Sequence, residues 1–249
     1  MLQTIKAVIH TTFSMTFTST FTFIHAIFVG PRRAAQYSMS IIVSMSSVMG
    51  VKYTNHTPGI VYEPNDLILA NHQSWFDAIV SFNIMTTEQR LIQLCARSGV
   101  RRVPGIGWWL VILGWPVLGR TPADRHRLTK HCGCDPVVIF PEGTRFTSAN
   151  HASAKVFAAK NGIECGDRTI LPRSGGAYSL MMNPLRKTIH IMTSIYDKNR
   201  VFPYNGHFPT DVDCITRSYK REEIPLETET EFRDWLRLRF LDMDADFKQ

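Results

Sequence analysis

The chain has 249 residues and a formal net charge of +7, from 28 Lys and Arg against 21 Asp and Glu. This length supports one well-buried α/β domain plus an appendage. The positive charge suggests an anionic partner, such as nucleic acid, phospholipid headgroups or a phosphorylated substrate, and does not choose among them. Five cysteines, an odd number in a chain too large to need disulfide staples, argue against a disulfide framework and indicate reduced thiols.

The first fifty residues are almost uncharged and form a unit of their own. Between Ala7 and Pro31 there is no Asp, Glu, Lys or Arg, and large apolar side chains alternate at helical spacing with Ser and Thr. This pattern is typical of a helix half sunk in a membrane, although a spanning helix is also compatible. A second uncharged run follows at 34–51, so we predict a membrane-associating helical hairpin over 1–51. Two core helices of a soluble protein are the alternative, and a secretory signal is disfavoured because the region is too polar.

From residue 52 onward the charges return, and turn residues bracket short β-rich runs, so the main domain is predicted to span 52–249. Strands are predicted at 60–62, 67–70 and 91–95, with a helix over 75–84 between the last two. The order strand, helix, strand predicts an α/β fold with a mostly parallel sheet covered by helices.

A histidine and a carboxylate follow the apolar run 67–70 directly. His72 lies in the turn after this predicted strand, and Asp77 follows five residues later. A histidine with a carboxylate to orient it is the arrangement of a general base. The alternative is a helix capping box, in which Ser74 caps the first turn and Asp77 bonds back to the Ser74 amide. The two interpretations are compatible, because a helix that starts at Ser74 leaves His72 in the preceding turn.

The segment from 97 to 120 joins cations to a Pro/Gly turn and then to an apolar run at 108–117, which is either core or a lipid-facing surface. Nucleic-acid binding is disfavoured, because the aromatic residues lie in the apolar run and not among the cations. A short basic helix is predicted near 125–131. A metal site is a further alternative, but its spacing matches no familiar zinc motif; it would use His126, His131, Cys132 and Cys134.

A second polar cluster follows the predicted buried strand 136–140. It reads Pro141-Glu142-Gly143-Thr144-Arg145, and its guanidinium is suited to bidentate phosphate contact. The alternative is a surface turn with a Glu–Arg ion pair, which adds little stability. Ligands in open α/β sheets bind beyond the carboxyl ends of strands. His72 and Arg145 both fall there, which favours one shared site.

The C-terminal third carries fewer signals. Residues 185–196 read as a strand-pair region, in which His190 is interpreted as structural. The pair Thr228 and Glu231 predicts the capped start of a final helix whose apolar positions pack on the domain.

Together, Asn71-His72-x-Ser74-x-x-Asp77 and Phe140-Pro141-Glu142-Gly143-Thr144-Arg145 resemble the glycerolipid acyltransferase family, whose best-known members are the 1-acyl-sn-glycerol-3-phosphate acyltransferases. The resemblance covers roughly 62–178. Between the motifs, Arg97 stands where the family usually has Lys, and the stretch before residue 140 is shorter than usual. The fourth, proline-containing block at 170–176 departs from the commoner apolar sequence, which leaves the acyl acceptor open.

The resemblance implies an O-acyltransferase of glycerol-phosphate acyltransferase-like fold. His72 would be the base and Asp77 its partner, and the substrate hydroxyl would be the nucleophile, in keeping with the lack of a G-x-S-x-G motif. The donor would be acyl-coenzyme A or acyl-acyl carrier protein, with no metal or other cofactor, and the acceptor a lysophospholipid, foremost 1-acyl-sn-glycerol-3-phosphate. The site would face the cytoplasmic side of a membrane. Alternatives are a remodelling acyltransferase for another lysophospholipid and a non-catalytic lipid-binding protein. The acceptor would be bound by Arg97, Arg120, Glu142, Gly143, Thr144 and Arg145.

Overall fold

The structure is a computed structural model, which describes residues 24, 26–48, 50–74, 76–86, 91–102, 107, 111, 114–118, 121–131, 135–196 and 211–247. Its helices are α2 (Pro31–Val48), α3 (Asp77–Thr86), α5 (Pro122–Thr129), α6 (Ser148–Lys160), α7 (Ser174–Met181) and α8 (Glu229–Asp246), with short 3-10 helices η1 (Ser98–Arg102) and η2 (Arg221–Glu223). Its strands are β1 (Lys52–Asn55), β2 (Leu67–Ala70), β3 (Gln93–Leu94), β4 (Ala96–Arg97), β5 (Val117–Leu118), β6 (Val137–Ile139), β7 (Thr188–Tyr196) and β8 (Asp211–Lys220).

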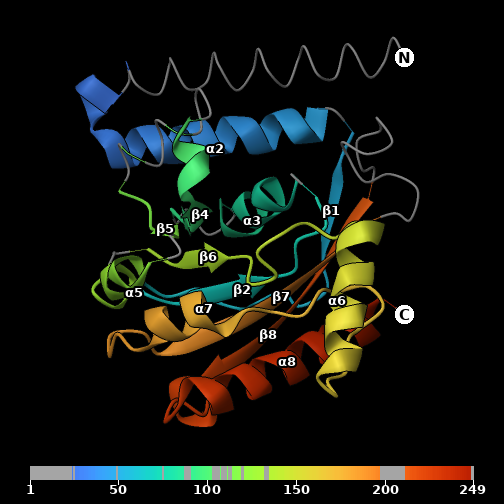
Figure 1. The fold of residues 1–249 in the computed structure, drawn as a ribbon. Helices are drawn as coiled ribbons and strands as arrows, with labels where there is room; N and C mark the ends of the chain where they lie inside the picture. Colours follow the sequence, from blue (N-terminus) through green and yellow to red (C-terminus); the bar gives the residue numbers. More distant parts are fainter. Residues whose placement is uncertain are drawn as a thin grey trace.

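Six strands form one sheet in the order β1-β8-β7-β2-β6-β3 (Figure 1). The neighbours β7, β2, β6 and β3 run parallel, β8 is antiparallel to β7, and β1 is parallel to β8. The predicted α/β fold with a mostly parallel sheet is therefore confirmed. A separate pair, β4 and β5, is also parallel. In the large sheet, β2 lies between β6 and β7, so the segments that follow these three strands leave at one edge.

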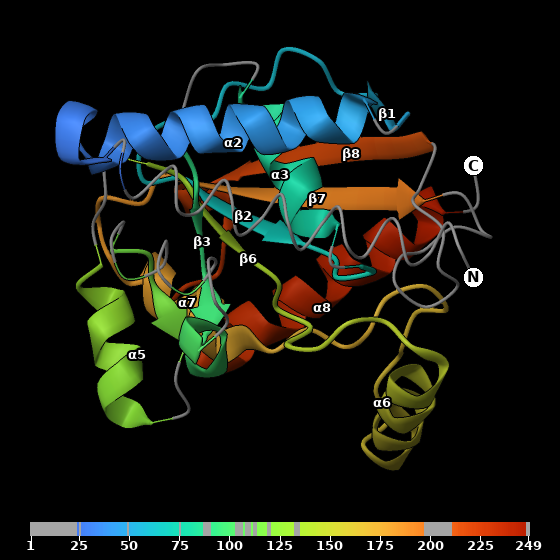
Figure 2. The ribbon, with the colours of Figure 1, turned by 90° about the horizontal axis from the view of Figure 1, so that it is seen from above.

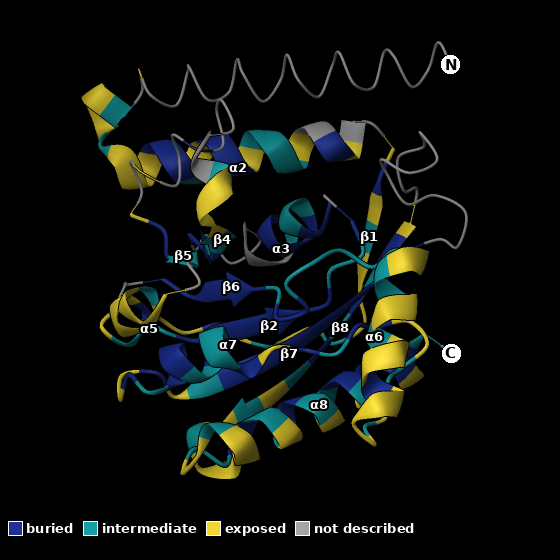
Figure 3. Cartoon of the chain, viewed as in Figure 1, coloured by how far each residue is buried: buried dark blue, intermediate teal, exposed yellow. Residues whose placement is uncertain are grey.

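Both faces of the sheet are buried, because successive side chains of each strand point to opposite sides. Ile68 and Ala70 belong to the core beneath α2 and α3, whereas Leu67 and Leu69 belong to the core against α7 and α8. Figure 2, seen from above, shows α2 and α3 in front of the sheet and α8 behind it, and Figure 3 shows the central strands β2, β6 and β7 as mostly buried. Because helices cover both faces of the sheet, all four residues of β2 are buried, which accounts for its continuous apolar sequence.

Helix α2 is attached to the main domain. Its small and apolar face, with Ala34, Ala35 and Met39, is buried, and Arg32 donates a hydrogen bond to Asp135 just before β6. Gly30 has φ +84° and α2 begins at the next residue, so a break in the helix lies near the junction of the two uncharged runs. Most of the first arm of that hairpin lies outside the described residues, and the hairpin as a whole stays a prediction. None of the described helices is long and apolar enough to cross a membrane.

Several element predictions need correction. Residues 60–62 form no strand, and β1 instead pairs with β8 at the sheet edge. The region 185–196 was expected to hold a strand pair, but it contains one long strand, β7 (Thr188–Tyr196), whose antiparallel partner β8 was not predicted. Helix α6 was also missed, although Thr147 caps it by accepting a hydrogen bond from the Asn150 amide. The final helix is confirmed, with the capping box of Thr228 and Glu231 at its start.

Candidate active site

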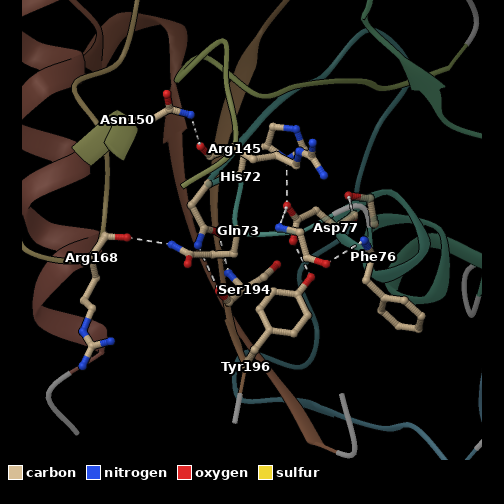
Figure 4. A network of polar contacts seen from close by, with 12 residues as sticks. His72, Gln73, Phe76, Asp77, Arg145, Asn150, Arg168, Ser194 and Tyr196 are labelled. Carbon is tan, nitrogen blue, oxygen red and sulfur yellow. Dashed lines mark hydrogen bonds and ion pairs between the residues drawn. The ribbon is translucent and has the colours of Figure 1, made fainter. Parts of the chain in front are cut away.

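The turn between β2 and α3 brings His72 and Asp77 together. His72 Nδ1 lies 2.7 Å from Asp77 Oδ2, with the Asp77 side chain 1 % exposed and the His72 side chain 24 % exposed. Figure 4 shows the two side chains facing each other. A proton on Nδ1 that is donated to the carboxylate leaves Nε2 with a free lone pair, as a general base requires. The imidazole also stacks on Phe140, with ring centroids 4.5 Å apart, so its orientation is held from two sides.

The capping interpretation of this turn is correct as well. The Ser74 amide donates to Asp77 Oδ2 at 2.8 Å, and Ser74 Oγ accepts from the Phe76 amide at 3.2 Å. Thus the same carboxylate oxygen both caps the start of α3 and contacts the imidazole. The capped turn therefore brings the Asp77 carboxylate to His72. On one regular helix, two side chains five residues apart would point away from each other.

The loop after β6 contacts this turn directly. The Phe146 amide donates to the His72 carbonyl at 2.7 Å, and β6 pairs with β2 in the register Leu69 with Ile139. The carboxyl ends of two adjacent parallel strands thus place the two sequence motifs side by side, as their separate predictions required. The two motifs are therefore adjacent in the structure, and a shared function of their residues stays a prediction.

Glu142 contradicts the alternative of a surface turn with an ion pair. The residue is 1 % exposed, and its carboxylate forms no ion pair with a residue that the structure describes. Burial raises the pKa of the Glu142 carboxyl well above its usual range, and the nearby charge of Asp77 raises it further, while backbone groups of Ile170 and His72 oppose the shift. Glu142 thus belongs to the inner wall of the site.

The remainder of the loop is shaped by its backbone. Gly143 has φ +68°, a conformation that residues with a Cβ rarely adopt, and it lies against the Arg173 side chain. The amide of Asn150, on the first turn of α6, donates from Nδ2 to Thr144 Oγ1 and to the Arg145 carbonyl, both at 3.0 Å. Arg145 itself is half-buried. Helix α6 therefore braces the segment that carries the guanidinium.

The other predicted cations lie elsewhere or outside the described residues. Arg97 is exposed on β4, in the small sheet, and pairs in register with Leu118 of β5. Arg120 lies outside the described residues, so its expected contact with the acceptor is not tested. No group of three metal-binding side chains occurs in the described part of the chain, but Cys132 and Cys134 fall outside it. The metal alternative is therefore not tested either.

Two contacts of β7 with the site were not predicted. Asn71 Nδ2 donates to the Ser194 carbonyl at 2.9 Å, and the Ser194 amide donates to Asn71 Oδ1 at 2.7 Å. Two residues further on, the Tyr196 hydroxyl donates to Asp77 Oδ1. Nothing near Tyr196 in the sequence marks it, because the pairing of β7 with β2 joins segments more than a hundred residues apart. His190, on the same strand, is buried between Asp66 and Ser218, which supports its structural interpretation.

Comparison with known proteins identifies the family. A family model described as Acyltransferase matches residues 51–197, more than half of the chain. The chain belongs to the acyltransferase family. Among curated relatives of this acyltransferase-family chain, lysocardiolipin acyltransferase 1 from Gallus gallus is 26% identical over 218 residues, which cover 80% of this chain and 57% of that protein. Lysophosphatidylinositol acyltransferase 10 from Caenorhabditis elegans is 25% identical over 231 residues, with coverages of 82% and 58%. The chain thus spans somewhat over half the length of these relatives.

A solved structure has the same fold. The 1-acyl-sn-glycerophosphate acyltransferase PlsC from Thermotoga maritima superposes with a TM-score of 0.70 over 99% of this chain and 95% of that one, at 15% sequence identity. This likeness shows that the two proteins share a fold over nearly the whole chain, while the family assignment rests on residues 51–197.

Proposed function

We propose that this chain is an enzyme that transfers a fatty acyl group from a thioester to the free hydroxyl of a lysophospholipid. The observation that carries the proposal is the His72–Asp77 pair at 2.7 Å, buried on its carboxylate side and accessible on its imidazole side, next to the Arg145 loop. Membership of the acyltransferase family supports the reaction class.

In this reaction His72 Nε2 takes the proton of the acceptor hydroxyl, and the oxygen attacks the thioester carbonyl. The carbon–sulfur bond then breaks, and the departing thiolate receives the proton from the imidazolium. Asp77 keeps Nδ1 protonated and stabilises the imidazolium, the role that a carboxylate has in a serine-hydrolase triad. The substrate supplies the nucleophile, so no enzyme serine and no further cofactor takes part.

Arg145 would bind the acceptor phosphate, since a guanidinium can contact two phosphate oxygens at once. Arg97 and Arg120 are the further candidates for this contact. The buried Glu142 and the turn at Gly143 would hold the loop in shape. As acceptor we propose first 1-acyl-sn-glycerol-3-phosphate, which would give phosphatidic acid, and the donor would be acyl-coenzyme A or acyl-acyl carrier protein.

A remodelling reaction on another lysophospholipid is the rival proposal. It is favoured by the names of two relatives, which act on lysocardiolipin and lysophosphatidylinositol. The departure of the 170–176 block from the commoner family sequence leaves the choice between the two acceptors open. In both cases the acceptor and product reside in a bilayer, which agrees with the net charge of +7 and with the proposed membrane association.

The test is an acceptor panel in mixed micelles, with acyl-coenzyme A or acyl-acyl carrier protein as donor and release of thiol as the signal. We expect acylation of lysophosphatidic acid, and strong preference for a phosphodiester lysolipid would establish the rival acceptor. His72→Ala should lower kcat by about 10²–10⁴-fold, the range typical of a lost general base. Full activity of purified His72→Ala would refute the mechanism.

Arg145→Lys serves as the probe of phosphate binding. It keeps the charge and loses the planar fork, so the KM for lysophosphatidic acid should rise while the KM for the thioester changes little. Arg127→Lys, at an exposed position of α5 away from the proposed site, is its matched control. Equal effects of both substitutions would remove Arg145 from the phosphate site.

A further inference from the structure

Tyr196 connects the end of β7 to the centre of the site. Its hydroxyl donates to Asp77 Oδ1, the oxygen opposite to the one that contacts His72. Figure 4 shows Tyr196 approaching Asp77 from the side away from His72. The tyrosine is 7 % exposed and Asp77 is fully enclosed. This hydrogen bond is therefore shielded from water, where an interaction with a charged acceptor is stronger than at the surface.

The backbone places Tyr196 with little freedom. Side chains two residues apart on a strand point to the same face, so Ser194 and Tyr196 share one side of β7, while Thr193 bonds to Asp246 on the other. The reciprocal hydrogen bonds between Asn71 and Ser194 lock the end of β7 beside the end of β2. The phenol hydroxyl thereby lies next to Asp77, the first residue of α3.

The phenol acts as a neutral donor. Burial raises the pKa of Tyr196 well above its usual range, and the negative charge of Asp77 raises it further. The hydroxyl therefore keeps its proton at the pH at which a histidine base works. A neutral donor on one carboxylate oxygen withdraws negative charge from the other, so it moderates how strongly Asp77 attracts the imidazole proton.

We propose that Tyr196 is a positioning residue of the acyl transfer, which fixes the Asp77 carboxylate in the rotamer that faces His72 and sets the strength of the Asp77–His72 contact. The proposal rests on the proposed function, because it assigns His72 the role of base. It adds a component that neither sequence motif contains.

The main experiment compares the full chain with its Tyr196→Phe variant, which removes one oxygen and preserves the ring. Without the donor, Asp77 attracts the imidazolium more strongly and is held less well. We expect kcat to fall by about tenfold, the effect of one hydrogen bond to a charged group, and the acidic limb of the kcat/KM profile to move to higher pH. Tyr62→Phe is the matched control, because Tyr62 is 2 % exposed and its hydroxyl lies near Thr216, away from Asp77.

Other titratable groups also interact with Asp77 or Tyr196, and their effects on the pH profile must be distinguished from that of the Tyr196 hydroxyl. Glu142 interacts with Asp77 from the loop after β6, Cys214 from β8, and Tyr53 with Tyr196 from β1. Burial raises the pKa of both Cys214 and Tyr53 to about 12, so neither titrates near neutral pH. The comparison is therefore repeated in a Glu142→Gln background, where the shift of the acidic limb should persist.

A second readout does not require turnover. The ring signals of His72, assigned by their loss in His72→Ala, are titrated by NMR in wild type and in Tyr196→Phe, and the midpoint should rise in the variant. If no acceptor is acylated, the proposed function fails, and this titration still decides whether Tyr196 acts on the pair. Incorporation of 3-fluorotyrosine at position 196 keeps the packing and strengthens the donor, and should move the midpoint downward even if Tyr196→Phe does not fold.

Unchanged midpoints in both variants would overturn the proposal. So would a fall in kcat that Tyr62→Phe reproduces without any change of the pH profile, since this would assign Tyr196 to packing alone. In a double-mutant cycle, Tyr196→Phe should have little further effect on kcat in an Asp77→Asn background, because the tyrosine acts through the carboxylate. Additive losses would also overturn the proposal.

Discussion

Asn71 and Ser194 exchange two hydrogen bonds, of 2.9 and 2.7 Å, across the ends of β2 and β7. Both residues are buried, and the next residue after Asn71 is the proposed base. The contact therefore joins strand pairing to the placement of His72, because the backbone cannot shift at Asn71 without moving the imidazole.

Removal of this contact should affect both stability and activity. Asn71→Ala leaves the Ser194 amide and carbonyl without these partners in a dry environment, so we expect a loss of about 2–4 kcal/mol in the free energy of unfolding and a lower kcat. Urea unfolding and thiol-release assays measure the two effects. Asn161→Ala, at the exposed end of α6, is the control, and an equal loss from both variants would contradict the assignment.

Gly143 offers a test of the acceptor loop. A Cβ at this residue would be strained at φ +68° and would meet the Arg173 side chain at 3.4 Å. Gly162, at the end of α6, has φ +63° and nothing within 4 Å of such a Cβ. Both Gly→Ala substitutions should cost about 1–2 kcal/mol of stability for the left-handed conformation. Only Gly143→Ala should also raise the KM for the acceptor, and a similar KM for the two variants would exclude a role for this turn.

Glu142 should make stability depend on pH. Its pKa is raised on folding, so its contribution to stability is greatest below the ordinary value of 4.5 and is lost as the pH rises toward the raised value. Glu142→Gln removes this ionisation while it preserves the shape of the side chain. The variant should therefore gain stability relative to wild type between pH 4.5 and 8, as measured by urea unfolding in a pH series. A constant difference over this range would show that the carboxyl does not titrate there.

Two truncations can separate membrane binding from folding. Deletion of residues 1–50 removes α2, whose Ala35 and Met39 lie in the core between the sheet and helices α2 and α3. This deletion should lower stability by about 1.5–3 kcal/mol for each large buried side chain lost, as well as release the protein from vesicles. Deletion of residues 1–29 spares α2 with its buried Ala35 and Met39, so we expect it to weaken vesicle binding with a smaller loss of stability than the longer deletion. Full retention on vesicles by both truncated proteins would place the membrane contact elsewhere.

The local geometry of the site could be predicted from single stretches of sequence. His72 and Asp77 lie within one turn, and Ser74 supplies the cap that brings them together, so their contact depends on near neighbours in the chain. The apolar runs before His72 and before Glu142 predicted buried parallel strands. The rule that ligands bind beyond the carboxyl ends of such strands was enough to place both motifs at one site.

Only the tertiary structure decided which strands are neighbours. The pairing of β7 with β2 brings Tyr196 to Asp77, and the pairing of β1 with β8 replaces the strand expected at 60–62. The depth of Glu142 was equally hidden, because a Pro-Glu-Gly turn reads as exposed until the segments around it are in place. Short-range hydrogen bonds and side-chain periodicity depend on residues that are close together in the sequence, so they can be predicted from it. The burial of one residue, and the donor that reaches its second oxygen, depend on segments more than a hundred residues away, and therefore on the folded sheet.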